Sequence, residues 1–309
     1  MSNQSRYLGV DVSKDTLVVA FERQRWQFAN TKEGQRKFIA QLKKLAGTVH
    51  VACEATGPYH LAMCLALQEA SVAVSICNAA RIRYFGLSEG ILAKNDPIDA
   101  ELIERFANAK RPEAHPPLSR EHLALNEMVA HRGQIVESIK LFRTHRQQVS
   151  AAALVKEIDK TLAALEKRLE IIDRKLREKI QAHASWKRTY EELLKVHGVG
   201  FVTALTLVVK MPELGSLNRG QCAALSGLAP YDDDSGQHNG RRSICGGRFE
   251  VRRVLYMSAL TAVRYNSILK TFYQRLLAQK KPFKVAITAV MRKLLIHLNT
   301  LLKPLQTTT

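Results

Sequence analysis

The chain has 309 residues, enough for two domains at the usual ~150 residues each, and its composition of 46% hydrophobic and 24% charged residues is that of a globular protein. It has no run of ~18 apolar residues and no basic-then-apolar leader, so we expect no membrane span and residence in the cytoplasm. Its five cysteines are scattered without a C-x-x-C pair, which argues against a disulfide framework or a zinc site.

Positive charge is the strongest compositional signal. Forty-seven Lys and Arg residues oppose 28 acids, which gives a formal net charge of +19. Residues 235–309 hold 14 basic residues and a single acid, whereas residues 1–100 hold 12 basic and 9 acidic residues. This uneven distribution indicates a polyanionic partner, most simply nucleic acid. An acidic membrane surface is the weaker alternative, because the apolar helices have the pattern of core helices.

The first third of the chain predicts alternating strands and helices. Residues 6–22 are rich in β-branched residues and predict two strands around a polar turn, with a third strand at 25–30. Buried strands are expected at 48–56 and 71–78, and helices at 31–47, from Pro58 and from Asp96 to about Lys110, with a short helix and loop at 79–90. The order predicts an α/β domain that begins with a β-hairpin.

A proline-rich boundary and two long helices follow. Three of the nine prolines fall in residues 111–119. From Arg120 to His183 the chain has no Pro and one Gly, and it predicts two antiparallel helices joined near 149–153. The second helix carries a heptad seam of Leu162, Leu165, Leu169, Ile172 and Leu176. The seam is equally compatible with a two-helix packing element and with an oligomer interface.

Residues 193–211 predict two helices joined by a Gly-x-Gly turn at Gly198 and Gly200, which is the pattern of a helix-hairpin-helix module. Such a turn presents backbone N–H groups to a phosphate without reading base sequence. A tight turn between two core helices would have the same pattern. The positive charge of the chain favours the phosphate-binding interpretation.

The remainder predicts helices around one polar segment. Residues 217–230 predict a short helix that ends at a glycine, and residues 231–248 are too polar for a core, so they predict an exposed loop or hairpin. The last three helices are expected at 249–266, 267–279 and 282–302.

Asp96 and Asp99 lie three residues apart, with a proline between them, where a helix is expected to begin. An Asp at the N-cap, a Pro at the first helical position and an acid in the first turn make an ordinary helix start. Taken alone, the stretch "KNDPIDAELIERF" therefore favours a capping role over a metal-binding role.

Two further acids change this assessment. Asp11 is flanked by valines inside the first strand, and Glu54 ends the strand at 48–56. Burying a lone carboxylate is costly, and two adjacent carboxylates repel each other unless a cation lies between them. Together with Asp96 and Asp99 they supply four hard oxygen ligands, which suit Mg²⁺ or Mn²⁺. A pair of such ions is a common catalyst of phosphodiester displacement.

Six stretches resemble one family, and they occur in the family's order. They are "YLGVDVSKDTL", "CEATGPY", "KNDPIDAELIERF", "LLKVHGVG", "LSGLAPYDDDSG" and "GRRSICGGRFEVRRVLYMSAL". The chain resembles the DEDD-type insertion-sequence transposases, which are related to the Piv invertase and guided by a bridge or seek RNA. The resemblance implies an RNase H-like (RuvC-like) catalytic domain over residues 1–115, an antiparallel coiled-coil connector over 116–185, and a mainly helical transposase domain with the helix-hairpin-helix and a serine motif over 186–309.

The resemblance also implies roles for single residues. The family's catalytic and metal-binding acids fall on Asp11, Glu54, Asp96 and Asp99, and its nucleophilic serine falls on Ser235 in "DDDSGQ". Guanidinium groups match the geometry of phosphate. The residues expected to bind nucleic acid are therefore Arg241, Arg242, Arg248, Arg252 and Arg253, with Gly198 and Gly200 in the turn.

The expected function is that of a recombinase that cuts and rejoins donor and target DNA and associates with the nucleoid when active. The resemblance implies a non-coding guide RNA, a homo-oligomer (dimer or tetramer) and an active site shared between subunits. Two other functions stay open. A RuvC-like, metal-dependent nuclease acting on branched DNA would need the four acids but not Ser235. A non-catalytic scaffold that binds RNA or DNA would need none of these five residues.

Overall fold

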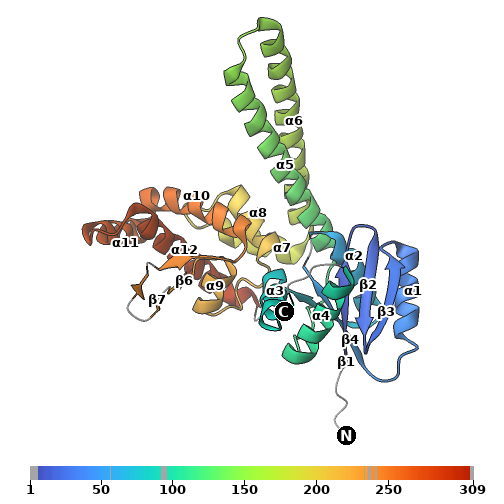
Figure 1. Cartoon of the computed structure of the whole chain (residues 1–309). Helices are drawn as coiled ribbons and strands as arrows, with labels where there is room; N and C mark the ends of the chain where they lie inside the picture. Colours follow the sequence, from blue (N-terminus) through green and yellow to red (C-terminus); the bar gives the residue numbers. More distant parts are fainter. Residues whose placement is uncertain are drawn as a thin grey trace. The chain divides into compact units, whose positions relative to one another are not determined.

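The computed structural model of the protein describes residues 6–55, 57–91, 96–232, 234–235, 238–240 and 242–306. The chain separates into two units, residues 1–123 and 124–309 (Figure 1). For two residues of interest, Asp96 and Ser235, the backbone is described and the side chain is not.

The first unit is built on a mixed five-stranded sheet with the strand order β3-β2-β1-β4-β5. Strands β1, β4 and β5 are parallel, and β2 and β3 are added to β1 as an antiparallel hairpin. The strands are β1 (Arg6–Val12), β2 (Thr16–Phe21), β3 (Gln24–Ala29), β4 (Val49–Glu54) and β5 (Ala73–Cys77). The α/β class and the hairpin at its start, both predicted from the sequence, are confirmed.

Helices cover both faces of this sheet (Figure 1). They are α1 (Lys32–Leu42), α2 (Tyr59–Glu69), α3 (Ala79–Ser88) and α4 (Asp96–Lys110). Because side chains alternate along a strand, β1 contributes to two cores. Leu8 and Val10 pack with Phe38 of α1 on one face. Tyr7 packs with Phe106 of α4 on the other.

Helix α1 ends five residues before the predicted end at Gly47. Leu42 is the last residue of the helix and is buried in the core. After it the chain forms two turns with hydrogen bonds between residues three apart. The N–H of Lys44 donates to the carbonyl of Gln41, and the N–H of Leu45 donates to the carbonyl of Leu42.

Helix α4 lies directly on β1 at Gly9. A Cβ atom at Gly9 would lie 2.1 Å from the carbonyl oxygen of Ala100 and 2.3 Å from the amide nitrogen of Glu104. Further along the helix, Asn108 Nδ2 donates to the carbonyl of Tyr7 at 3.5 Å. Residue numbers along α4 therefore decrease where those along β1 increase, so α4 runs antiparallel to β1. Its N-terminus lies toward the carboxyl end of β1.

We expect Gly9→Ala to destabilise the first unit by about 1–3 kcal/mol, since the added methyl group meets backbone atoms that cannot rotate away. Urea unfolding followed by circular dichroism measures the change. Gly133→Ala is the matched control, because Gly133 lies inside a helix with no atom within 4 Å of the added Cβ. That change should stabilise by up to ~1 kcal/mol. Equal stability of Gly9→Ala and the unaltered protein would contradict the close packing of α4 on β1.

Two long helices, α5 (Arg120–Gln148) and α6 (Ala152–Ala182), form as predicted, with three residues between them. Three ion pairs connect them: Arg132–Asp173 at 2.6 Å, Arg143–Glu166 at 2.7 Å and Arg146–Asp159 at 2.8 Å. The two residues of a pair are closer in sequence the nearer the pair lies to the connection between the helices. The helices are therefore antiparallel (Figure 1). The predicted seam is partly buried along the pair, and Leu176 at its end is fully buried.

The rest of the second unit is a helical core with one small β-segment. Its helices are α7 (Ala184–Leu194), α8 (Phe201–Lys210), α9 (Arg219–Leu225), α10 (Phe249–Tyr265), α11 (Ser267–Ala278) and α12 (Phe283–Gln306). The strands, of two residues each, are β6 (Pro230–Tyr231), β7 (Asp234–Ser235), β8 (His238–Asn239) and β9 (Ser243–Ile244). Within the described chain, α12 is the one helix whose length and apolar composition would allow it to cross a membrane. Half of its most apolar stretch is buried in the protein.

Candidate active site and nucleic-acid interface

Asp11 and Glu54 lie at the carboxyl ends of two adjacent parallel strands. The register pairs Val10 of β1 with Cys53 of β4. The residue that follows each of these, Asp11 and Glu54, therefore reaches the same edge of the sheet. Neighbouring strands are about 4.8 Å apart, so the register brings the two acids next to each other although 42 residues separate them in sequence.

Both acids also belong to the sheet face that α4 covers. Asp11 is two residues from Gly9, which touches α4. Glu54 is two residues from Ala52, which packs in the same core as α4. Side chains two residues apart on a strand share a face. Both acids are partly buried.

The start of α4 brings the other two acids to this edge. Helix α4 begins at Asp96, and Asp99 lies in its first turn and is partly buried. The contact between Ala100 and Gly9 places this turn over the end of β1. Asp11, Glu54 and Asp99 are thus carried by elements that converge at one edge of the sheet, with the backbone of Asp96 one turn before Asp99.

The donor chemistry of these acids fits a divalent cation. Carboxylate oxygens are the ligands that Mg²⁺ and Mn²⁺ prefer. Among the described side chains, no group of three or more His, Cys, Asp or Glu is arranged to hold a metal ion. The side chain of Asp96, the fourth candidate ligand, lies outside what the structure describes.

The cysteine beside Glu54 belongs to the opposite core. Cys53 is fully buried with Cys64 of α2, and their Sγ atoms are 3.6 Å apart. The hydrogen bond with Cys64, together with burial, raises the pKa of the Cys53 thiol well above its usual value. A thiol that stays protonated is a poor metal ligand. Both Cys53 and Cys64 are free, buried thiols.

Ser235 lies in a narrow β-hairpin that projects from the helical core (Figure 1). Strand β6 pairs with β9 at the base of the hairpin. Further out, β7 pairs with β8, and Ser235 is opposite His238. The hairpin was one of the two structures that the sequence predicted for residues 231–248.

The Gly-x-Gly turn joins α7 to α8 as predicted. Gly198 has a φ of +100°, and a Cβ atom there would lie 2.8 Å from the carbonyl oxygen of Ser258 in α10. Gly200 precedes α8 as its N-cap, and no atom lies within 4 Å of a Cβ built there. Packing against α10 therefore accounts for Gly198, while the space around Gly200 is open.

Among the predicted arginines, Arg248 has a clear structural role. Its Nη1 and Nη2 atoms donate to the two carboxylate oxygens of Glu213 at 2.8 and 2.7 Å, and Nη1 also donates to the carbonyl of Lys210 at 2.8 Å. The hydrogen bond with Glu213 raises the pKa of Arg248. This network attaches the start of α10 to the segment after α8. A role of Arg248 in phosphate binding stays a prediction.

The other arginines differ in their surroundings. Arg252 Nη1 donates to the carbonyls of Gly246 at 2.7 Å and Gly227 at 3.2 Å. Arg253 pairs with Glu137 of α5 at 3.3 Å, with both side chains more than half exposed. Arg242 forms an exposed ion pair with Asp232. Arg241 lies outside the described residues.

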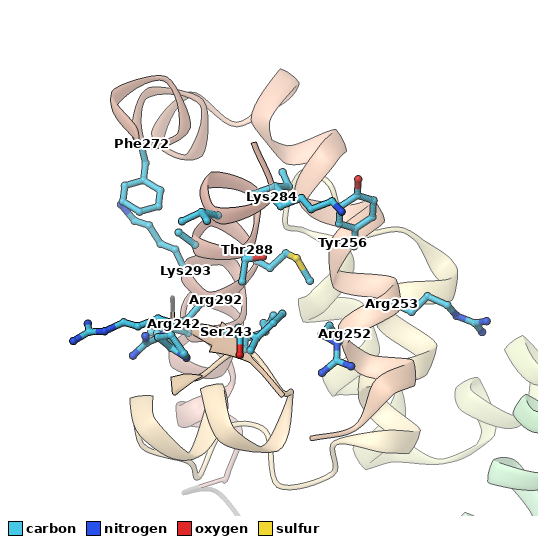
Figure 2. A pocket seen from close by; sticks show the side chains of 18 of the residues that line it. Arg242, Ser243, Arg252, Arg253, Tyr256, Phe272, Lys284, Thr288, Arg292 and Lys293 are labelled. Atoms are coloured by element: carbon cyan, nitrogen blue, oxygen red, sulfur yellow. The ribbon is translucent and has the colours of Figure 1, made fainter. Parts of the chain in front are cut away.

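A cavity of about 1280 Å³ opens between α10 and α12 (Figure 2). No acid is among the described residues that line it. Its basic residues are Arg219, Arg242, Arg252, Arg253, Lys284, Arg292 and Lys293. The last three belong to α12, and none of them is among the residues that the sequence predicted to bind nucleic acid. The available signal was the excess of positive charge in residues 235–309, to which all three contribute.

Comparisons with known proteins agree with this geometry. Residues 8–158 match the DEDD transposase family of IS110 type, and residues 190–274 match the transposase family IS116/IS110/IS902. The pilin gene-inverting proteins of Moraxella bovis and Moraxella lacunata are each 27% identical over 301 residues, which cover 94% of this chain and 93% of theirs. The two family matches include all four acids and Ser235. The chain belongs to the IS110 family of DEDD transposases and recombinases, enzymes that cleave and rejoin DNA.

Proposed function

We propose that the protein transposes an insertion sequence by cutting and rejoining DNA, with the acids Asp11, Glu54, Asp96 and Asp99 and the nucleophile Ser235 acting on the same phosphodiester. A non-coding guide RNA selects the target. The observation that carries the proposal is the convergence of Asp11, Glu54 and the start of α4 at one edge of the sheet.

The strand order supports an RNase H-like, RuvC-like domain over residues 1–115. Three parallel strands extended by an antiparallel hairpin, in the order 3-2-1-4-5, make the sheet of that fold. In open α/β sheets, ligands bind outside the carboxyl ends of the strands. The acids occupy this position on β1 and β4.

The four acids would hold Mg²⁺ or Mn²⁺. Such an ion, when bound, neutralises charge that develops on the oxygens of the phosphodiester. The contribution of the chain is to present several carboxylates on one face. The rigid contact of α4 with Gly9 keeps the start of that helix over the strand end. The cap at the helix start and metal binding are compatible, because a carboxylate has more than one lone pair.

Ser235 is the proposed nucleophile. Its hydroxyl oxygen forms a bond to phosphorus while the bond from phosphorus to the 3′ oxygen of DNA breaks, which leaves a 5′-phosphoserine and a free 3′-hydroxyl. A serine hydroxyl is a weak nucleophile at neutral pH and needs activation. We propose that the acidic site supplies it, and that cations around the hairpin stabilise the charge on the phosphate.

The relatives support recombination rather than simple cleavage. Their names describe inversion of a pilin gene, and inversion requires that every cut strand be rejoined. We extend this to the protein, with donor and target DNA as substrates. The long helices α5 and α6 are proposed to act as a coiled-coil connector over residues 116–185 in a homo-oligomer, and residues 186–309 to bind DNA partly through the helix-hairpin-helix.

Nucleic-acid affinity should fall steeply with added salt, because cations of the protein displace counterions from phosphates. With about six phosphates contacted, the loss is roughly a thousandfold between about 50 and 200 mM salt. Fluorescence anisotropy with duplexes of unrelated sequence measures it. Arg253→Glu should weaken all of them by a similar factor, since a phosphate contact carries no base information. Affinity that does not change with salt would refute the electrostatic part of the proposal.

A further inference from the structure

The cavity of the second unit lies between the exposed faces of two helices. On α10, Phe249, Arg252 and Tyr256 are spaced by three and four residues, so they share one face. The facing residues of α12 have the same spacing; they are Val285, Thr288, Arg292 and Ile296. Strand β9 adds Ser243 and Ile244, and α11 adds Phe272.

The wall of the cavity is apolar and aromatic where solvent reaches it. Phe249 is 59% exposed, Val285 is 52% exposed and Tyr256 is 37% exposed. Large apolar side chains that gather at one exposed site commonly mark an interaction surface. Figure 2 shows Tyr256 and Phe272 on different sides of the cavity, on α10 and α11 respectively.

Positive charge surrounds this apolar wall. Lys284, Arg292 and Lys293 have no ion pair with an acid in the described part of the chain. Lys293 Nζ lies 4.4 Å from the ring centre of Phe272, and Figure 2 shows the two side chains together. Aromatic rings and cations in one groove are what a single nucleic-acid strand requires, since bases stack on rings and phosphates bind cations.

Size and charge distinguish among occupants. The volume of about 1280 Å³ exceeds the ~300–1,000 Å³ of ordinary small-molecule pockets, which favours part of a polymer. A second copy of the chain is disfavoured, because each copy has a formal net charge of +19 and the lining offers no acid to pair with its cations. Duplex DNA presents phosphates but keeps its base faces stacked, so it would leave the aromatic wall unused.

We infer that the cavity between α10 and α12 binds an unpaired nucleic-acid strand, with at least one base against the apolar wall and the flanking phosphates on Lys284, Arg292 and Lys293. The inference rests on the proposed function in taking nucleic acid as the ligand. The cavity begins at β9, the base of the hairpin whose outer strands carry Ser235. A strand held there is unpaired next to the segment that is proposed to cut it.

The test measures binding of labelled oligothymidylate, oligouridylate and a short DNA duplex by fluorescence anisotropy, in chelator and in a Ser235→Ala background. These conditions remove strand cleavage, so failure of the proposed chemistry does not affect the result. Ala289→Trp places a large ring in part of the cavity without changing charge, and Phe249→Ala removes a ring. The matched control is Tyr265→Ala, which removes a ring that is 71% exposed at the end of α10 and does not line the cavity.

A second pair of variants separates local from overall charge. Lys284→Glu and Lys270→Glu change the net charge equally, and Lys270 is exposed on α11 but does not line the cavity. We expect Ala289→Trp and Phe249→Ala each to weaken binding of a single strand by at least about fivefold, the low end for loss of one base stack. Lys284→Glu should weaken it by at least as much, because it replaces a phosphate contact with a repulsive charge. The two controls should change it by less than about twofold.

Three results would overturn the inference. One is unchanged single-strand binding in Ala289→Trp and Phe249→Ala, both folded by circular dichroism. Another is an equal loss of duplex and single-strand binding in these variants. The third is a changed oligomeric state in light scattering with unchanged binding, which would make the cavity an interface between copies. Whether DNA or RNA is the physiological strand follows from which oligonucleotide loses more affinity.

Discussion

Replacing Asp11 with Asn should abolish recombination while leaving the fold intact. The substitution keeps the size of the side chain and removes one of the carboxylates that gather at the ends of β1 and β4. Without metal, the variant should be as stable as the unaltered protein or slightly more so, because a repulsive charge is lost. The corresponding changes at Glu54, Asp96 and Asp99 should have the same effect. A plasmid recombination assay and thermal unfolding in chelator measure the two quantities.

The matched control for Asp11→Asn is Asp15→Asn, four residues further on. Asp15 is exposed in the turn after β1, so its neutralisation changes the net charge equally without affecting the sheet edge. It should recombine normally. If Asp99→Asn recombines at the normal rate with or without a chelator, the metal site does not include Asp99, and its role is that of an acid in the first turn of α4.

Ser235→Ala should reduce recombination by roughly a millionfold, the loss typical of removing a nucleophilic serine. DNA and RNA binding should be unchanged, because the substitution removes a single oxygen atom. Ser216→Ala is the control, since Ser216 is an exposed serine in the same unit whose hydroxyl donates to a nearby carbonyl. Normal strand cleavage in Ser235→Ala would favour the alternative, a RuvC-like nuclease that uses water.

The local structure of the chain was largely predictable. Alternating β-branched residues predicted the hairpin at 6–22, and the absence of Pro between Arg120 and His183 predicted α5 and α6. These patterns are local, and each element is specified by its own residues. The start of α4 at Asp96 was predictable for the same reason, because Asp, Pro and a second acid follow one another in sequence.

The environments of the arginines were less predictable, because they depend on contacts between distant segments. "GGRFEVRR" gives no indication that Arg248 is held by Glu213, while Arg253 on the same helix pairs with Glu137 of α5. The cavity between α10 and α12 depends on the packing of two helices that are 17 residues apart in sequence. The sequence predicted both helices but not which of their faces would remain exposed.

The acids lie between these two cases. The valines around Asp11 predicted a poorly solvated carboxylate. Glu54, an acid at the end of another buried strand, predicted that the two carboxylates share a cation. That the two share an edge required the register of β1 and β4, which is set by pairing across 42 residues. That Asp99 reaches the same edge depends on the contact of α4 with Gly9.

The most direct measurement of the central claim is a trapped recombination reaction, with labelled DNA, resolved on a denaturing gel. The protein with Ser235 intact should give a shifted band, the covalent protein–DNA adduct. The band should be absent from Ser235→Ala, from Asp11→Asn and from the unaltered protein in chelator, because the serine is proposed to depend on the acidic site for its activation. A shifted band in Ser235→Ala would assign the nucleophile to another residue. A band of normal intensity in Asp11→Asn would show that Ser235 acts without the acids. That result would contradict the proposed activation of Ser235 by the acidic site.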